Sequence, residues 1–226
     1  MTLREWDAKL RLVPYRTVPL VNNEIYHVFN RGVEKRSIFL SPGDYERFLM
    51  VLNYYQHGGP KPRFSQLSRF QDLKIDANKK IVEIVCYCLM PNHFHLLIRQ
   101  LKKTGVSEFM RKVSDSFTRY FNTKHDRIGS LFQGAFKAIR IESDEQLIHV
   151  SRYIHLNPLV SILVKDLKDY LWSSYLDYIG KNFGGPCNNR AVMDFFNSKE
   201  EYGQFVLDQE DYGKRLEFIK HHLVDK

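Results

Sequence analysis

Apolar and polar residues alternate along this chain in two rhythms, one typical of strands and the other typical of helices. Residues 24–32 and 81–99 are rich in β-branched and aromatic residues, as strands are. The second stretch is divided by Leu89-Met90-Pro91-Asn92, in which proline fixes φ and asparagine bonds its own backbone. We therefore predict a first strand that ends at Gly32 and a β-hairpin over Ile81–Arg99.

Three other stretches carry apolar residues at helical spacing. One begins at Ser41-Pro42-Gly43-Asp44, and a second runs over Gly105–Asn122. The third, Ser143–Pro158, starts with a capping box made by Ser143 and Gln146 and is expected to end at Pro158. Extended structure is expected between the second and third helices.

The order of these elements predicts an α+β fold in which helices pack on an antiparallel sheet. We expect an N-terminal arm over residues 1–23, one main domain over 24–179, and a helical C-terminal extension over 180–226. The connection over residues 57–80 is longer than usual, which favours a functional or mobile loop. We find no internal repeat.

Composition narrows the choice of partner and compartment. A hydrophobic fraction of 43% and an aromatic fraction of 14% exclude a disordered chain. The net charge of +8 and the pI of about 9.3 suit a polyanion such as nucleic acid, although a merely soluble basic protein has the same balance. Three cysteines make no disulfide framework, and neither a signal peptide nor a membrane span is recognisable, so we expect a cytoplasmic, reduced protein with no membrane partner.

Two histidines give the hairpin candidate chemistry. His93 and His95 lie at i and i+2 of a strand, so both side chains project from one face and could ligate one divalent cation. Taken alone, a His-x-His pair is more often a pair of packed core histidines. His27, which has no i+2 partner, is expected to be packed.

Tyr153 and Asn157 lie one turn apart on the third predicted helix. The phenol could act as a nucleophile and the carboxamide oxygen as a metal ligand. Packing of Tyr153 at a helix–sheet seam and termination of the helix by Asn157 before proline are the structural alternatives.

Four ordered blocks then point to a family. They are Tyr87-Cys88-Leu89-Met90-Pro91-Asn92-His93-Phe94-His95-Leu96-Leu97, Gly129-Ser130-Leu131-Phe132-Gln133-Gly134, Arg152-Tyr153-Ile154-His155-Leu156-Asn157-Pro158 and Trp172-Ser173-Ser174-Tyr175. Together they resemble the single-tyrosine HUH transposases, in the branch of the REP-associated tyrosine transposases and the insertion-sequence-200-like enzymes. The likeness runs from about Ile25 to Tyr178.

The resemblance implies a ferredoxin-like sheet, single-stranded DNA with hairpin structure as partner, and a divalent metal, Mg²⁺ or Mn²⁺. It implies that Tyr153 attacks phosphorus to form a 5′-phosphotyrosine link, with His93, His95 and Asn157 as metal ligands. Mixed nitrogen and oxygen ligands suit Mn²⁺ at least as well as Mg²⁺.

Basic and polar residues near the predicted elements are candidates for DNA contact, since cations follow a phosphate backbone and bases stack on interleaved aromatic rings. They are Arg31, Lys35, Arg36, Arg111, Lys112, Arg119, Gln133, Lys137 and Arg140. A solvated surface is the alternative at each position. The chain also departs from the family where Leu159-Val160-Ser161-Ile162 stands in place of a basic residue and a small Ala-Gly pair, and where Ala135 replaces a basic residue. These departures put DNA contacts in doubt more than catalysis.

Other interpretations stay open at this point. If residues 89–92 form a four-residue turn, Cys88 opposes His93 and Cys86 opposes His95, which would make a structural zinc site. A hairpin-binding module that no longer cuts, and a replication-initiator or relaxase nuclease, are alternative functions. The sequence decides neither between monomer and homodimer nor which hairpin is recognised.

Overall fold

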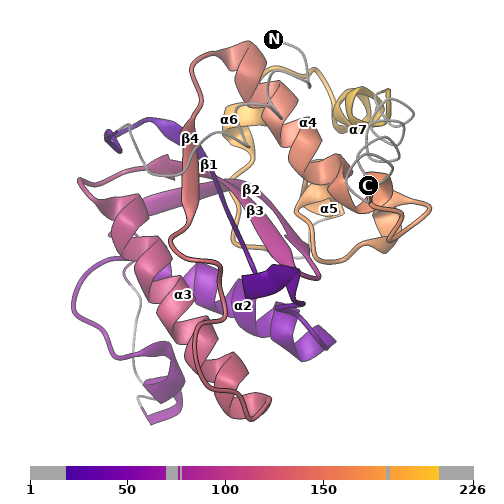
Figure 1. Ribbon diagram of the computed structural model, residues 1–226. Helices are drawn as coiled ribbons and strands as arrows, with labels where there is room; N and C mark the ends of the chain where they lie inside the picture. The colour runs from indigo at the N-terminus through magenta and orange to yellow at the C-terminus, as the bar shows by residue number, and fades with distance from the viewer. Residues whose placement is uncertain (1–18, 70–75, 77, 182–183, 209–226) are drawn as a thin grey trace.

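The computed structural model describes residues 19–69, 76, 78–181 and 184–208 (Figure 1). Most of the predicted N-terminal arm and the last part of the predicted C-terminal extension lie outside these ranges. The strands are β1 (Ile25–Arg31), β2 (Val82–Met90), β3 (His93–Gln100) and β4 (Lys137–Arg140). The α-helices are α2 (Pro42–Tyr55), α3 (Gly105–Lys124), α4 (Asp144–Val160), α5 (Tyr175–Tyr178), α6 (Arg190–Met193) and α7 (Lys199–Leu207).

The four strands form one antiparallel sheet in the order β2-β3-β1-β4. The chain runs β1, α2, β2, β3, α3, β4, so each half of the main domain contributes two strands and one helix. This order and topology are those of a ferredoxin-like fold, as expected. Two strands distant in sequence, β1 and β3, therefore lie side by side at the centre of the sheet.

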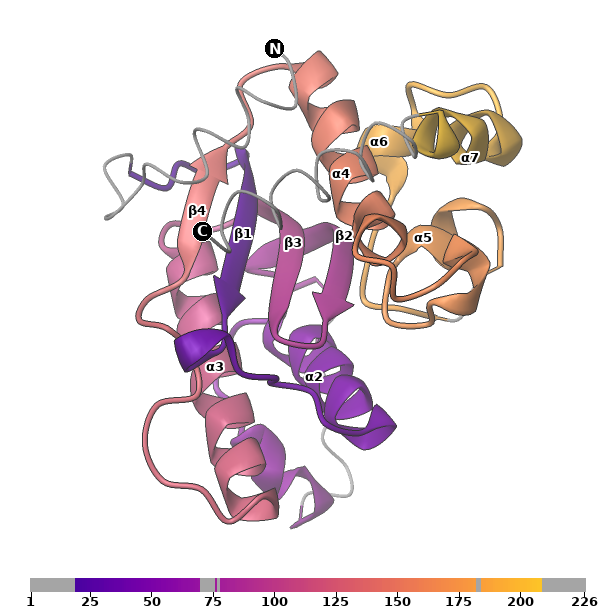
Figure 2. The same cartoon turned by 45° about the vertical axis from the view of Figure 1, so that its right-hand side comes forward.

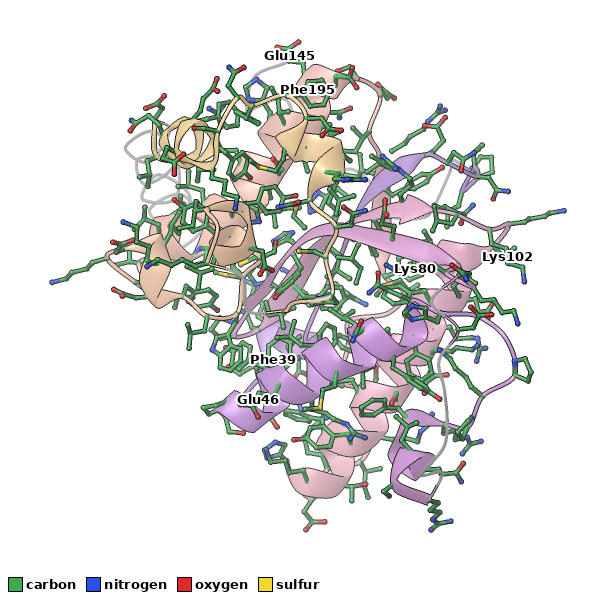
Figure 3. The ribbon with its side chains drawn as sticks, turned by 180° about the vertical axis from the view of Figure 1, so that it is seen from behind. Phe39, Glu46, Lys80, Lys102, Glu145 and Phe195 are labelled. Carbon is green, nitrogen blue, oxygen red and sulfur yellow. The ribbon has the colours of Figure 1, made fainter. Side chains whose placement is uncertain are left out.

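Helices cover both faces of the sheet (Figures 1 and 2). α2 and α3 cover one face, and α4 with the C-terminal helices covers the other. Alternation along β3 divides its side chains accordingly: Phe94, Leu96 and Ile98 join the core under α2 and α3, while Leu97 joins the core under α4. His93 and His95 share the α4 side with Leu97. Seen from behind, Glu145 of α4 and Phe195 lie at the opposite end of the molecule from Glu46 of α2 (Figure 3).

The hairpin turn is shorter than the predicted four residues. Leu89 and Met90 belong to β2, so only Pro91 and Asn92 connect the strands. The N–H groups of Ile38 and Phe39 both donate to the carbonyl oxygen of Pro91, at 2.8 and 3.1 Å, which holds the turn from outside. The shorter turn changes which β2 residues face the histidines.

The tyrosine-bearing helix α4 begins as predicted and ends later than predicted. Ser143 Oγ accepts a 3.1 Å hydrogen bond from the N–H of Gln146, while Gln146 Oε1 accepts from the N–H of Glu142. The expectation that Pro158 ends the helix is wrong, because α4 continues to Val160. Proline in the last turn removes a single intrahelical donor, and the N–H of Ser161 still donates to Asn157 O at 2.9 Å.

Beyond residue 179, the described C-terminal residues include two helices, α6 and α7, joined and preceded by irregular structure. In the long connection over residues 57–80, the part that the structure describes contains the short 3₁₀ helix Phe64–Arg69. No helix within the described ranges is both long and apolar enough to cross a membrane.

Candidate active site

The two hairpin histidines and the helix tyrosine lie together between the sheet and α4. The ring centroids of His93 and His95 are 4.9 Å apart, and that of Tyr153 is 5.5 Å from His95. Tyr153 is half-buried and meets the His95 ring edge-on. Residues some 60 positions apart are thus brought within contact, because β3 is central in the sheet and α4 packs directly over it.

Hydrogen bonds orient both imidazoles. Nδ1 of His93 lies 2.6 Å from Oδ1 of Asn92, and Nδ1 of His95 lies 2.9 Å from Nε2 of His27. An amide oxygen can only accept, so His93 carries its proton on Nδ1. Among the described residues these bonds engage Nδ1 alone in both rings, which leaves Nε2 of each as the atom able to bind a metal.

The histidines are neutral at neutral pH. Burial lowers the pKa of His27 to about 3. Burial, then the charge of Arg31, lowers the pKa of His93 to about 4. Burial, then the neighbouring His93 and His27, lowers the pKa of His95 well below its usual value. A neutral imidazole is the form that ligates metals, so these environments suit a metal site.

Asn157 is placed by the helix that carries the tyrosine. Its Nδ2 donates a 2.7 Å hydrogen bond to the backbone oxygen of Tyr153, one turn earlier. The amide nitrogen is thereby occupied, and Oδ1 is the atom suited to a hard cation. These side chains could offer a divalent cation two imidazole nitrogens and one amide oxygen, a mixed set of the kind that Mn²⁺ accepts.

A structural zinc site made by two cysteines and two histidines is wrong. The two-residue turn pairs Met90 with His93 and Cys88 with His95, while Cys86 faces Leu97. Cys86 and Cys88 are both buried, and burial raises the pKa of each thiol. Within the described part of the chain, no three side chains of His, Cys, Asp or Glu are grouped as metal ligands would be.

Three of the predicted DNA-contact residues lie on the histidine side of the sheet. Arg31 pairs with His93 across β1 and β3, and its Nε donates to Oε1 of Gln133. Lys137 pairs with Phe29, which faces His95 at a ring distance of 5.9 Å. Arg31, Gln133 and Lys137 are exposed, so they make a polar rim beside the candidate metal ligands.

The other predicted contact residues are dispersed. Arg36 pairs with Glu34 at 3.2 Å, Lys112 with Glu108 at 2.7 Å, and Arg140 with Glu24 at 2.8 Å. Lys35 is exposed in the 3₁₀ turn Val33–Lys35, next to Arg36. Arg111 and Arg119 are exposed on α3, which covers the face opposite α4.

Sequence reasoning missed the partners of the motif histidines. His27 was expected to be merely packed, yet it is hydrogen-bonded to His95. The sequence feature that could have indicated this contact is the position of His27 on the same face of β1 as Phe29 and Arg31. His155, in the tyrosine block, lies 2.7 Å from Tyr202 Oη and 2.8 Å from Ser174 Oγ. Ser174 in turn accepts from the N–H of Tyr87 at 2.8 Å, so the fourth sequence block ties α4 to β2.

Comparisons with known proteins agree with this arrangement. Residues 69–157 match the model of the family described as "Transposase IS200 like", a stretch that holds His93, His95, Tyr153 and Asn157. A comparison with curated proteins gives no match.

Solved structures support the fold. One described as "Structure of the REP associates tyrosine transposase bound to a REP hairpin" is similar with a TM-score of 0.54 and 16% identity, over 75% of this chain and 87% of that chain. A candidate transposase from Deinococcus radiodurans R1 has a TM-score of 0.36 and 13% identity, over 63% of this chain and 95% of that chain. The predicted resemblance is confirmed: residues 69–157 match the IS200-like transposase family, and the fold is similar to that of a REP-associated tyrosine transposase.

Proposed function

We propose that this transposase relative cleaves and rejoins single-stranded DNA by transesterification on Tyr153, through a 5′-phosphotyrosine intermediate. The observation that carries the proposal is the position of the Tyr153 ring, 5.5 Å from His95, on the face where His93 and His95 share one side of β3. The family match and the fold support a transposase.

In this reaction the phenolic oxygen of Tyr153 forms a bond to phosphorus while the bond from phosphorus to the 3′-oxygen breaks. The phenol loses its proton, and the departing 3′-oxygen takes one up. One phosphodiester is exchanged for another, so reversal joins strands without a nucleotide cofactor. The free phenol has a pKa of about 10, so it needs help to ionise at neutral pH.

The residues around Tyr153 have separate roles in this proposal. His93, His95 and Asn157 would hold a divalent cation, Mg²⁺ or Mn²⁺, and when bound it supplies positive charge to a non-bridging phosphate oxygen. His27 and Asn92 fix the ring orientation of the two histidines. Arg31, Gln133 and Lys137 line the approach of the phosphate backbone.

The proposed DNA partner is a hairpin with single-stranded DNA beside it. A structure of similar fold was solved with a REP hairpin bound. The net charge of +8 favours such a polyanion. Both a monomer and a homodimer are compatible with this proposal.

The test is a covalent-adduct assay with labelled single-stranded hairpin oligonucleotides taken from beside the gene. Wild-type protein with Mn²⁺ is expected to give a covalent protein–DNA band that is absent with chelator and absent from Tyr153→Phe. Tyr120→Phe is the matched control, since it removes a hydroxyl from α3 instead, and it is expected to retain the band. An adduct that survives in Tyr153→Phe would move the nucleophile elsewhere, and tight binding without cleavage by wild type would favour a binding module.

A further inference from the structure

A groove of about 510 Å³ lies between α3 and the segment 130–136, on the other side of that segment from the candidate metal ligands. Its volume is within the ~300–1,000 Å³ typical of small-molecule sites, which suits unpaired nucleotides. The α3 wall presents Ser107, Arg111, Ser114 and Thr118, spaced by four, three and four residues along one helical face. Hydroxyl and guanidinium groups therefore line this wall, together with Met110 and Asp115.

The second wall is shared with the active site. Phe132, Gly134 and Phe136 line the groove, whereas Gln133, between them, bonds Arg31 on the histidine side. Asn30 also lines the groove, and its Nδ2 donates to Gly134 O at 3.2 Å. Asn30 and Arg31 are neighbours on β1, and Arg31 is the cross-strand partner of His93. The groove, which Asn30 lines, is therefore separated from Arg31 only by the segment 130–136.

The charges of the groove favour an anion, with one carboxylate as an exception. Arg111 and Arg119 line it and are exposed. Asp115 also lines it and lies 3.7 Å from Arg111, which it partly neutralises. In the described ranges no carboxylate is within ion-pair distance of Arg119, so its charge is available to a phosphate.

We propose that this groove binds the unpaired nucleotides adjoining the bond that Tyr153 cleaves, with phosphates on Arg119 and Arg111 and bases against the aromatic wall. The inference rests on the proposed function for the identity of the strand. Serine and threonine hydroxyls contact phosphate and sugar, and aromatic faces stack bases without sequence preference. The strand would then pass over Gln133 to reach Arg31 and the histidines.

The experiment measures binding in the Tyr153→Phe background, where no chemistry occurs, by fluorescence anisotropy on one hairpin with and without a single-stranded flank. Arg119→Gln is expected to weaken binding of the flanked hairpin about tenfold and to reduce its salt slope by about 0.7, the loss of one single-strand phosphate contact. Binding of the hairpin without a flank is expected to stay unchanged. Asp115→Asn is expected to strengthen binding of the flanked hairpin.

Arg69→Gln is the matched control, because it removes the same charge from an exposed site that does not line the groove. Equal weakening of both hairpins by Arg119→Gln, or none, would overturn the groove assignment. Failure of the wild-type protein to form the covalent adduct would count against the proposed function. The groove assignment would still be decided by the binding measurement, which does not depend on cleavage.

Discussion

Two histidine clusters on the α4 side of the sheet both contain buried histidines, but their ring nitrogens are bonded differently. Burial lowers the pKa of His27 and of His155 to about 3 in both cases. His155 uses both ring nitrogens, on Tyr202 and Ser174, whereas the described bonds of His93 and His95 engage one nitrogen each. A lowered pKa therefore does not identify a functional histidine here. In the proposed function, the feature that distinguishes His93 and His95 is the ring nitrogen left for a ligand.

The largest effect is expected for His93→Ala. Loss of one metal ligand is expected to reduce the rate of adduct formation by about 10³-fold, since a bound cation contributes several kcal/mol to such a transition state. The unfolding free energy is expected to change little, because His93 is half-buried and, among the described residues, its one hydrogen bond is to Asn92. Denaturant unfolding and single-turnover cleavage on the same preparation measure both quantities. A large loss of stability in this variant would contradict the distinction between the clusters.

The converse is expected for His155→Ala. This change removes one buried hydrogen-bond partner each from Tyr202 Oη and Ser174 Oγ and opens a cavity, so we expect a loss of about 2–4 kcal/mol in unfolding free energy. Cleavage, measured at a temperature where the variant is folded, is expected to fall far less than in His93→Ala. His149→Ala on the same helix is the control: it removes a partly exposed histidine and is expected to cost less than about 1 kcal/mol.

His27 offers an intermediate case, since it is buried yet acts through His95. His27→Phe removes the acceptor for His95 Nδ1, and we expect about a 10- to 100-fold increase in the Mn²⁺ concentration needed for half-maximal cleavage. Partial recovery in His27→Gln, which keeps an acceptor, would support an orienting role. An unchanged Mn²⁺ requirement in His27→Phe would instead make His27 a packing residue.

The smallest expected effect is on stability at acid pH, which depends on Asp44 and on neither histidine cluster. Burial alone would raise the pKa of Asp44, but hydrogen bonds from Lys124, the N–H of Leu40 and His125 outweigh it and lower the pKa from 3.8 to about 2. The stabilisation from Asp44 is thus complete above pH 4 and is lost as the pH falls from about 4 to about 2. Because Lys124 is partly exposed and solvent screens its charge, we expect about 1–2 kcal/mol. Unfolding of Asp44→Asn across this range should show a difference from wild type that vanishes near pH 2.

The hairpin and the start of α4 could be predicted because each depends on residues close together in the sequence. The Pro91-Asn92 turn and the alternation around it predicted the hairpin, and Ser143 with Gln146 predicted the start of α4. These features depend on neighbours in sequence. The face shared by His93 and His95 follows from strand geometry alone.

Non-local contacts account for what the sequence did not reveal. The cysteine positions were misplaced because the turn is two residues shorter than the four assumed, which moves every cross-strand partner by two positions. The contact of His27 with His95 spans 68 residues, and that of His155 with Tyr202 spans 47. Neither has a periodic signature.

The strand order has a consequence for synthesis of the protein. β1 lies between β3 and β4, two strands that come much later in the chain. A nascent chain shorter than 137 residues leaves one edge of β1 unpaired, and such edges invite association with other chains. Pairing of β1 must wait for distant segments, which slows folding. Tyr153 follows β4, so the proposed nucleophile is synthesised only after the strand that completes the sheet around the histidines.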